Sequence, residues 1–208
     1  MPLSKSIGIF GGAFAPFHNG HLRAALEARD RLGLEQVRLI PTAQPMHRPD
    51  TRVSALRRLE WLRLAIRKEK GLVADDAEIQ RGGPSYTIDT LSSLRESHPQ
   101  ARLVLLLGAD AFAHFHTWHR WREILELAEL AVIARPGVAL APPPEAATEL
   151  RGRYRSLELP LLDISSTRIR WLLKKGRSVR GLLPDAILNS LTPADRAALT
   201  EDENPNTH

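Results

Sequence analysis

The sequence has no cysteine among its 208 residues. This absence excludes disulfides, thiolate-bound metals, iron–sulfur clusters and thiol nucleophiles together. Long apolar runs are missing as well. The longest purely aliphatic stretch, Leu103 to Leu107, is far shorter than the roughly 20 residues of a membrane-spanning helix, and the run Ile7 to Phe10 is too short for a secretory signal. We therefore expect a cytoplasmic protein with no membrane partner.

The composition is that of an ordinary globular domain, with 43% hydrophobic and 25% charged residues. The length fits one domain, which we place at residues 1–192, followed by a polar C-terminal tail at residues 193–208 that we expect to be frayed. Lys+Arg 29 against Asp+Glu 24 gives a net charge of +5. This balance favours anionic ligands such as phosphates. Basic and aromatic residues are not interleaved as in nucleic-acid-binding proteins, so we expect no nucleic-acid partner.

Four short apolar runs are the expected strands, at residues 7–10, 37–40, 102–107 and 130–134. Their hydrophobicity is continuous rather than alternating, as in strands buried on both faces of a parallel sheet. Helical patterns lie between and after them, at residues 21–32, 54–68, 87–97, 165–175 and 184–191, and the proline-rich residues 138–147 are expected to form a loop. This order predicts an α/β fold with a doubly wound, mostly parallel sheet and C-terminal helices.

The residues after the first apolar run, Gly11 to His21, favour a phosphate site, because ligands bind at the carboxyl ends of parallel strands. The glycines let backbone N–H groups approach a phosphate, and the N-terminus of the following helix adds partial positive charge. His18 and His21 are three residues apart, so in a helix they share a face and can serve one anionic group. An ordinary glycine turn, a metal half-site and Asn19 as a simple helix N-cap are the alternatives.

A second polar segment, Ile164 to Arg170, precedes another expected helix. Ser165 and Ser166 offer hydroxyls and free N–H groups at a helix start, while Arg168 and Arg170 supply guanidinium charge for a polyphosphate. The alternatives are a plain helix cap and a solvated arginine face.

Together, the two segments resemble a known pair of signatures. Residues 11–21 fit Gly-Gly-x-Phe-x-Pro-x-His-x-Gly-His and residues 164–170 read Ile-Ser-Ser-Thr-Arg-Ile-Arg, as in the nucleotidyltransferase superfamily. The chain between them resembles the bacterial nicotinate mononucleotide adenylyltransferases, in segments 41–48, 84–91, 108–110, 117–118 and 135–137. The resemblance runs from residue 7 to about residue 191.

This resemblance implies a Rossmann-like nucleotidyltransferase fold and a reaction in NAD biosynthesis, in which ATP and nicotinate mononucleotide give nicotinate adenine dinucleotide and pyrophosphate. It makes His18 and His21 the catalytic residues. The implied ATP-binding residues are Gly11, Gly12, Phe14, His18, His21, Gly108, Asp110, Ser165, Ser166, Arg168 and Arg170. Those implied for nicotinate mononucleotide are His47, Arg48, Tyr86, Thr87, Trp118 and Arg135. Mg²⁺ is expected to be held mainly by the ATP phosphates, with no metal ligands from the protein.

Several of these residues have structural alternatives. Trp118 and Tyr86 suit core packing as well as contact with a pyridine ring, and Asp110 suits a helix cap as well as a ribose contact. We expect the cluster His114, His116 and His119 to lie at the surface or at a pocket rim rather than to bind metal. The remaining tryptophans are expected to be packing residues, at positions Trp61, Trp121 and Trp171.

Two positions depart from the family pattern, since Ala13 stands where the family usually has Thr or Ser, and Ala15 where it usually has Asp. Each change removes a polar group from the expected phosphate loop. Two alternatives therefore stay open. The chain could be another transferase of the superfamily, acting on phosphopantetheine or a cytidylyl acceptor, or a non-catalytic nucleotide- or RNA-binding relative. The sequence is compatible with a homo-oligomer and does not fix the choice between acid and amide mononucleotides.

Overall fold

The computed structural model describes residues 5–44, 52–134, 140–159 and 162–201. Its centre is a six-stranded sheet in which every adjacent pair of strands is parallel, in the order β3-β2-β1-β4-β5-β6. The strands are β1 (Ser6–Gly12), β2 (Gln36–Pro41), β3 (Leu72–Ala74), β4 (Arg102–Gly108), β5 (Glu129–Ala134) and β6 (Tyr154–Glu158). The doubly wound parallel α/β fold predicted from the sequence is confirmed.

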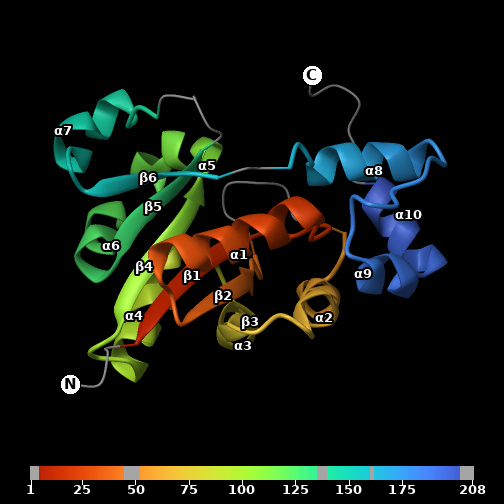
Figure 1. Cartoon of the computed structure of the whole chain (residues 1–208), viewed down its shortest axis with the longest axis horizontal. Helices are drawn as coiled ribbons and strands as arrows, with labels where there is room; N and C mark the ends of the chain where they lie inside the picture. The colour runs from red at the N-terminus through yellow and green to blue at the C-terminus, as the bar shows by residue number, and fades with distance from the viewer. Residues whose placement is uncertain (1–4, 45–51, 135–139, 160–161, 202–208) are drawn as a thin grey trace.

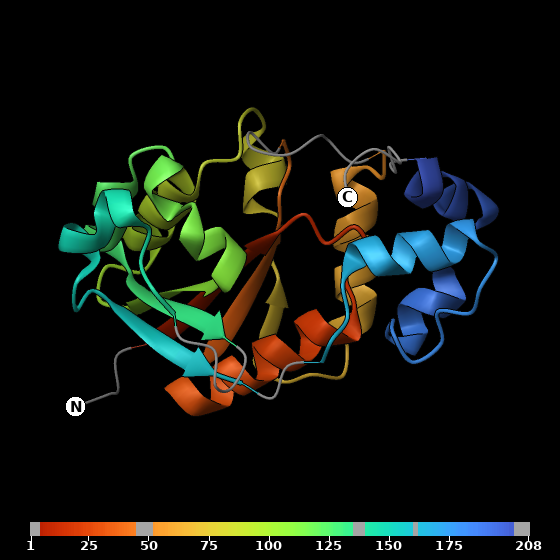
Figure 2. The ribbon, with the colours of Figure 1, turned by 90° about the horizontal axis from the view of Figure 1, so that it is seen from above.

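The helices cover both faces of this sheet and form a separate group at one end of it (Figures 1 and 2). Those in the first part of the chain are α1 (Asn19–Leu32), α2 (Ala55–Ile66), α3 (Ala77–Arg81), α4 (Thr87–Ser97), α5 (Ala109–Ala113) and α6 (Trp121–Leu127). Further along are the 3₁₀ turns Phe115–Thr117 and Pro144–Ala146, then α7 (Ala147–Leu150), α8 (Ser166–Lys174), α9 (Asp185–Ser190) and α10 (Pro193–Glu201). Among these described helices none has both the length and the apolar composition needed to cross a membrane.

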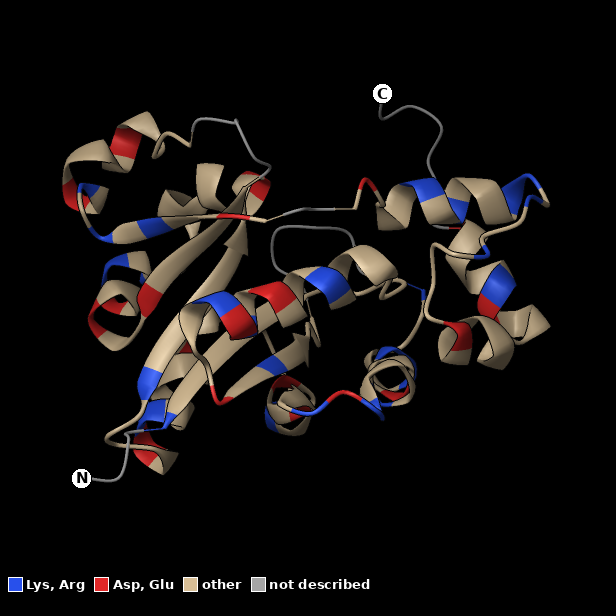
Figure 3. Cartoon of the chain, in the orientation of Figure 1, with Lys and Arg blue, Asp and Glu red and all other residues tan. Residues whose placement is uncertain are grey.

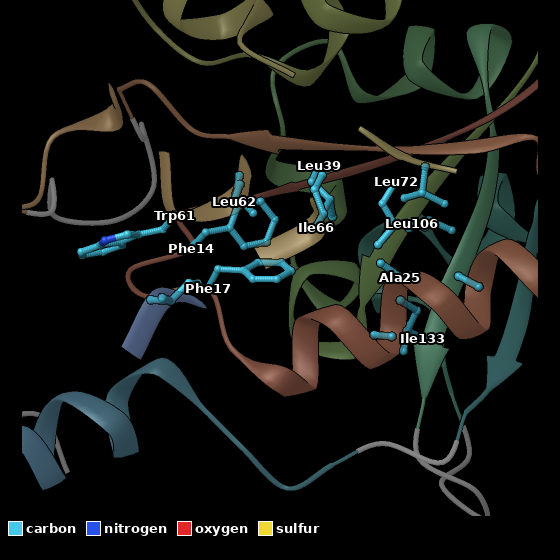
Figure 4. Packing of buried hydrophobic residues seen from close by; sticks show 14 of the residues in the cluster. Phe14, Phe17, Ala25, Leu39, Trp61, Leu62, Ile66, Leu72, Leu106 and Ile133 are labelled. Atoms are coloured by element: carbon cyan, nitrogen blue, oxygen red, sulfur yellow. The ribbon is translucent and has the colours of Figure 1, made fainter. Parts of the chain in front are cut away.

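Strand β4 shows why the central strands are apolar throughout. Leu103, Leu105 and Leu107 belong to one buried cluster, which also contains the apolar side of α4. Val104 and Leu106 belong to the other, together with the inner sides of α1 and α2. Successive side chains of a strand point to opposite faces, so a strand between two cores needs apolar residues at every position. Figure 4 shows part of the cluster that contains Val104 and Leu106, to which Ala25 and Leu72 also belong.

The strand order places a crevice in the middle of the sheet. From β1 the chain proceeds to β2 and β3 on one side, and β4 then pairs with the other side of β1 before the chain continues to β5 and β6. Ligands of open α/β sheets bind where the order reverses in this way, outside the carboxyl ends of the strands. The carboxyl ends of β1 and β4 are Gly12 and Gly108.

The structure corrects the expected C-terminal tail and part of the expected loop. Residues 193–201 form helix α10, in which Leu199 is fully buried, so the frayed tail does not begin at residue 193. Within the proline-rich segment the described residues include a 3₁₀ turn and the start of α7.

The edge strand β6 was missed because most of its side chains are exposed. Trp171 is also exposed, at 39%, whereas Trp61 and Trp121 are buried as expected.

Candidate active site

Two stacked imidazoles stand at the N-terminus of α1. The rings of His18 and His21 lie 3.6 Å apart between centroids with an interplanar angle of 19°. His18 is the N-cap residue of the helix, and each Nδ1 accepts a hydrogen bond from the other residue's backbone N–H, both at 3.3 Å. Asn19, for which a simple N-cap was the alternative interpretation, instead begins the helix, and its side chain donates to the carbonyl of Gly181.

These reciprocal bonds fix the protonation pattern of both rings. A neutral imidazole has one N–H, and a nitrogen that accepts a hydrogen bond from a backbone N–H cannot carry it. Burial lowers the pKa of His18 to about 4, and burial followed by the charge of His18 lowers the pKa of His21 well below its ordinary value. Near neutral pH both rings are therefore neutral and both carry their proton on Nε2. The pair presents two N–H donors on one side of the helix start.

Aromatic side chains hold His21 in place. The Phe17 ring stacks on it at 5.4 Å and the Phe14 ring meets it edge-on at 5.1 Å. Phe14 is 2% exposed and has a positive φ of 49°. The ring of Phe14 is thus part of the core under the histidines, and only its backbone is placed to reach a nucleotide.

The second motif closes over the loop between β1 and α1. Ser166 donates its hydroxyl hydrogen to the carbonyl of Pro16 at 3.0 Å, and Arg170 Nη1 donates to the carbonyl of Ala15 at 3.0 Å. Ser165 caps α8 by accepting from the N–H of Arg168 at 3.1 Å. Segments about 150 residues apart in the chain therefore meet at the histidines. Figure 3 marks the Lys and Arg positions along α8.

The structure shows how the two unusual alanines fit into this loop. The carbonyl of Ala15 accepts a hydrogen bond from Arg170, and the carbonyl of Ala13 accepts one from Arg58 at 2.7 Å. Both contacts use main-chain atoms, so neither depends on the side chain that the family pattern supplies. The loop keeps these anchors without the hydroxyl and the carboxylate.

A cavity of about 420 Å³ opens beside this loop, at the point where the strand order reverses. Seven of the predicted site residues line it, namely Gly11, Gly12, Tyr86, Thr87, Gly108, Asp110 and Trp118. Phe14, the two histidines and the predicted residues of the second motif are not among its lining residues. His47, Arg48 and Arg135 lie outside the described residues.

One end of the cavity is aromatic. The rings of Tyr86 and His119 lie 4.3 Å apart at 32°, and Trp118 packs against Phe115 at 5.5 Å. Tyr86 is the N-cap residue of α4 and gives this helix no side-chain cap. The N–H of Thr87 makes no hydrogen bond to another described residue. The predicted pyridine-binding residues are thus brought together, with a free backbone donor beside a flat aromatic surface.

Three residues of this region were missed by sequence reasoning. Arg58 lies in the predicted helix 54–68, where a charged side chain is ordinarily exposed, but it is only 1% exposed. Ser85 accepts hydrogen bonds from the N–H groups of Ala43 and Gln44 and so ties the segment after β2 to the cavity. Glu78 is a buried carboxylate of the cavity wall. Ser85 lies in segment 84–91, which the resemblance marks without giving this residue a role. No local pattern marks Arg58 or Glu78, because their surroundings come from distant parts of the chain.

The histidine cluster divides between two places. His114 and His119 line the cavity. His116 Nε2 lies 3.8 Å from a carboxylate oxygen of Glu145. Within the described segments, no three His, Asp or Glu side chains are grouped closely enough to hold a metal ion.

Comparison with known proteins agrees with this geometry. Residues 9–171 match the profile of the cytidylyltransferase-like family. A probable nicotinate-nucleotide adenylyltransferase of Marinobacter nauticus is 44% identical over 199 residues, which cover 88% of this chain and 92% of the relative. One from Pseudomonas fluorescens is 43% identical, covering 89% and 94%. The chain belongs to the cytidylyltransferase-like family, in the branch of nicotinate-nucleotide adenylyltransferases. The resemblance seen in the sequence is confirmed, and the chain is a nucleotidyltransferase.

Solved structures support the fold. The nicotinic acid mononucleotide adenylyltransferase of Plasmodium falciparum, complexed with NaAD, aligns with a TM-score of 0.71 at 17% identity and covers 95% of each chain. A putative nicotinate-nucleotide adenylyltransferase of Vibrio parahaemolyticus aligns with a TM-score of 0.59 at 20% identity, covering 94% of this chain and 98% of that one. At these identities the likeness concerns the architecture, and it identifies the six-stranded sheet as the nucleotidyltransferase fold.

Proposed function

We propose that the chain transfers the adenylyl group of ATP to nicotinate mononucleotide, giving nicotinate adenine dinucleotide and pyrophosphate in NAD biosynthesis. The observation that carries the proposal is the position of the paired Nε2–H donors of His18 and His21. They stand at the N-terminus of the helix that follows Gly11 to Ala13, and those three residues line the same cavity as Tyr86, Thr87 and Trp118. Relatives named for this reaction are 40% to 44% identical over about nine-tenths of the chain. We expect the reaction to run in the cytoplasm, the compartment that supplies ATP.

The chemistry needs no nucleophile from the protein. An oxygen of the acceptor's phosphate, already ionised at neutral pH, attacks the α-phosphorus of ATP. A new phosphorus–oxygen bond forms, the bond to the β-phosphate oxygen breaks, and pyrophosphate leaves with the bonding electrons. Negative charge spreads over the α-phosphate oxygens in the transition state, and positioned N–H donors stabilise it. His18 and His21 supply these donors as neutral imidazoles.

Residues of the second motif receive the leaving group. Arg168 and Arg170, with the hydroxyl of Ser165 at the start of α8, offset the charge of the β- and γ-phosphates, while the Ser166 hydroxyl holds the carbonyl of Pro16. The described residues offer no cluster of carboxylates for a metal. A magnesium ion would be held mainly by the ATP phosphates, and it would supply neutralisation of the phosphate charge.

The acceptor's pyridine ring stacks on Trp118, and its carboxylate accepts a hydrogen bond from the N–H of Thr87. A flat aromatic face and a free donor at a helix N-terminus match the two ends of a nicotinate group. Gly108 and Asp110 lie at the end of β4, where Asp110 accepts from a ribose hydroxyl.

Pyrophosphate release from magnesium ATP tests the proposal, with nicotinate mononucleotide, nicotinamide mononucleotide and phosphopantetheine as separate acceptors. Release with nicotinate mononucleotide, accompanied by the dinucleotide product in equal amount, is the expected result. Release with phosphopantetheine alone would move the chain to another reaction of the superfamily. ATP binding without release for any acceptor would contradict an enzymatic role.

A further inference from the structure

Arg58 is a charged residue in the interior of the protein, near the start of α2. Its guanidinium donates from Nη1 to the carbonyl of Ala13 at 2.7 Å, from Nη2 to the carbonyl of Thr42 at 2.7 Å and from Nε to the carbonyl of Val53 at 3.1 Å. Ala13 and Thr42 both line the cavity, one after β1 and the other after β2. A single side chain therefore joins the two loops that border the nucleotide crevice.

These bonds orient two successive peptide groups. The carbonyl of Gly12 accepts from the N–H of Thr42 at 3.0 Å, and the carbonyl of Ala13 accepts from Arg58. In a trans peptide the N–H points away from the carbonyl, so the N–H groups of Ala13 and Phe14 are turned to the opposite side. Neither of these N–H groups makes a hydrogen bond to another described residue. Consecutive free N–H groups of this kind bind phosphate oxygens.

Building on the function proposed above, we propose that Arg58 is a positioning residue for adenylyl transfer. By holding the carbonyls of Ala13 and Thr42, it aims the N–H groups of Ala13 and Phe14 at the triphosphate of ATP. Its fixed positive charge lies behind the same loop and favours an anion in front of it. Arg58 touches neither substrate, and it acts through the backbone of the loop.

The neighbouring residue provides a matched control. Arg57 lies on the same turn of α2, and its guanidinium binds Asp195 and the carbonyl of Ser190 in the C-terminal helices. Substituting either arginine removes a charge and several hydrogen bonds from the same helix. Only the substitution of Arg58 releases the loop after β1. A purely structural role for Arg58 therefore predicts similar consequences for both positions.

The first experiment compares Arg58→Met, Arg58→Lys and Arg57→Met by pyrophosphate release, with the folded fraction of each measured by circular dichroism. For Arg58→Met we expect kcat to fall about 100-fold, the order of loss caused by a misplaced binding group, with the KM for nicotinate mononucleotide changed less than threefold. Arg58→Lys keeps the charge and reaches fewer carbonyls, so it should recover part of kcat. Arg57→Met should melt at lower temperature with kcat near that of the wild type. If kcat per folded molecule fell equally in Arg58→Met and Arg57→Met, the proposal would be overturned.

A second measurement covers the case in which Arg58→Met does not fold. Inorganic pyrophosphate is titrated into the wild type and into Arg58→Lys while the amide resonances of Ala13 and Phe14 are followed by NMR. The proposal expects both resonances to shift in the wild type, with affinity at least tenfold weaker in Arg58→Lys. Unchanged affinity in Arg58→Lys would refute it. A wild type that binds pyrophosphate at these amides but transfers no adenylyl group would contradict the proposed function, while the role of Arg58 in the loop would be supported.

Discussion

Arg57 and Asp195, 138 residues apart in the sequence, form a bidentate ion pair that fastens α10 to α2. Nε donates to one carboxylate oxygen at 3.1 Å and Nη2 to the other at 2.8 Å. Asp195 also accepts from the N–H and the hydroxyl of Thr192, so the same carboxylate caps α10. Helix α10 also packs against α8, so the pair holds the C-terminal helices to the rest of the domain.

The first prediction concerns this carboxylate. Asp195→Ala should lower the free energy of unfolding by about 3 kcal/mol, since it removes the bidentate partner of a partly buried guanidinium together with a helix cap. Urea unfolding at pH 7 measures the change. Glu60→Ala is the control, because Glu60 contacts the same arginine from an exposed position and should cost less than about 1 kcal/mol. Equal losses in the two variants would show that the link to α10 adds nothing.

The second prediction is an acid-labile contribution from His18. Its pKa is lowered to about 4 by burial, so below pH 6.5 the unfolded chain binds a proton that the folded chain does not. The stability that depends on neutral His18 is therefore complete above pH 6.5 and is lost as the pH falls towards 4. A shift of this size corresponds to about 3 kcal/mol. The free energy of unfolding, measured at pH 7, 5.5 and 4.5, should fall less steeply with decreasing pH for His18→Asn than for the wild type. An equal pH dependence in the two proteins would contradict the buried neutral ring.

The third prediction concerns catalysis by the same ring. His18→Asn keeps a side-chain oxygen that can cap α1 but removes the Nε2–H donor. Loss of one such donor to a transition-state charge costs about 10²-fold to 10³-fold in kcat. Steady-state pyrophosphate release should show this fall with little change in melting temperature. His98→Asn, far from the loop at the end of α4, should leave kcat unchanged.

The layout of these residues was partly readable in the sequence. Helix α4 begins and ends where its apolar period predicts, at Thr87 and Ser97, and each central strand extends its predicted run by one to three residues. The three-residue spacing of the histidines correctly placed both rings at one helix start. That spacing could not show that His18 lies outside the helix as its cap, because capping depends on backbone dihedrals.

Other features depend on contacts between distant segments. An amphipathic pattern assigns arginine to the solvent side, and nothing near Arg58 in the sequence indicates the three carbonyls that satisfy it inside. The short strand β3 and the edge strand β6 have too few buried side chains to give a periodic signal. Helix α10 is recognisable only through the partners of Leu199 and Asp195, which lie in other helices.

The fourth prediction restores a hydroxyl to the loop after β1. Ala13 lines the cavity, and its contact to Arg58 uses the carbonyl, so Ala13→Ser adds a donor without disturbing that contact. One additional hydrogen bond is worth about 0.5 to 1.5 kcal/mol, which corresponds to a KM for ATP lowered about twofold to tenfold. Ala113→Ser, on the exposed side of α5, is the control. A higher KM in Ala13→Ser would mean that the loop has adapted to alanine.

The fifth prediction uses the N–H of Thr87 as the reader of the pyridine carboxylate. Thr87 is the first residue of α4, a position where proline is tolerated, and the preceding Tyr86 has the extended backbone (φ −102°, ψ 128°) that a following proline requires. Thr87→Pro therefore deletes one N–H while keeping the helix. The wild type should prefer nicotinate over nicotinamide mononucleotide, and the variant should lose about tenfold to 100-fold of that preference in kcat/KM, since a hydrogen bond to a charged group contributes about 1.5 to 3 kcal/mol. Thr87→Ala keeps the N–H and loses only the hydroxyl, so it should retain the preference. If Thr87→Ala and Thr87→Pro lose it equally, the hydroxyl rather than the backbone reads the carboxylate; if neither does, the carboxylate is bound elsewhere in the cavity.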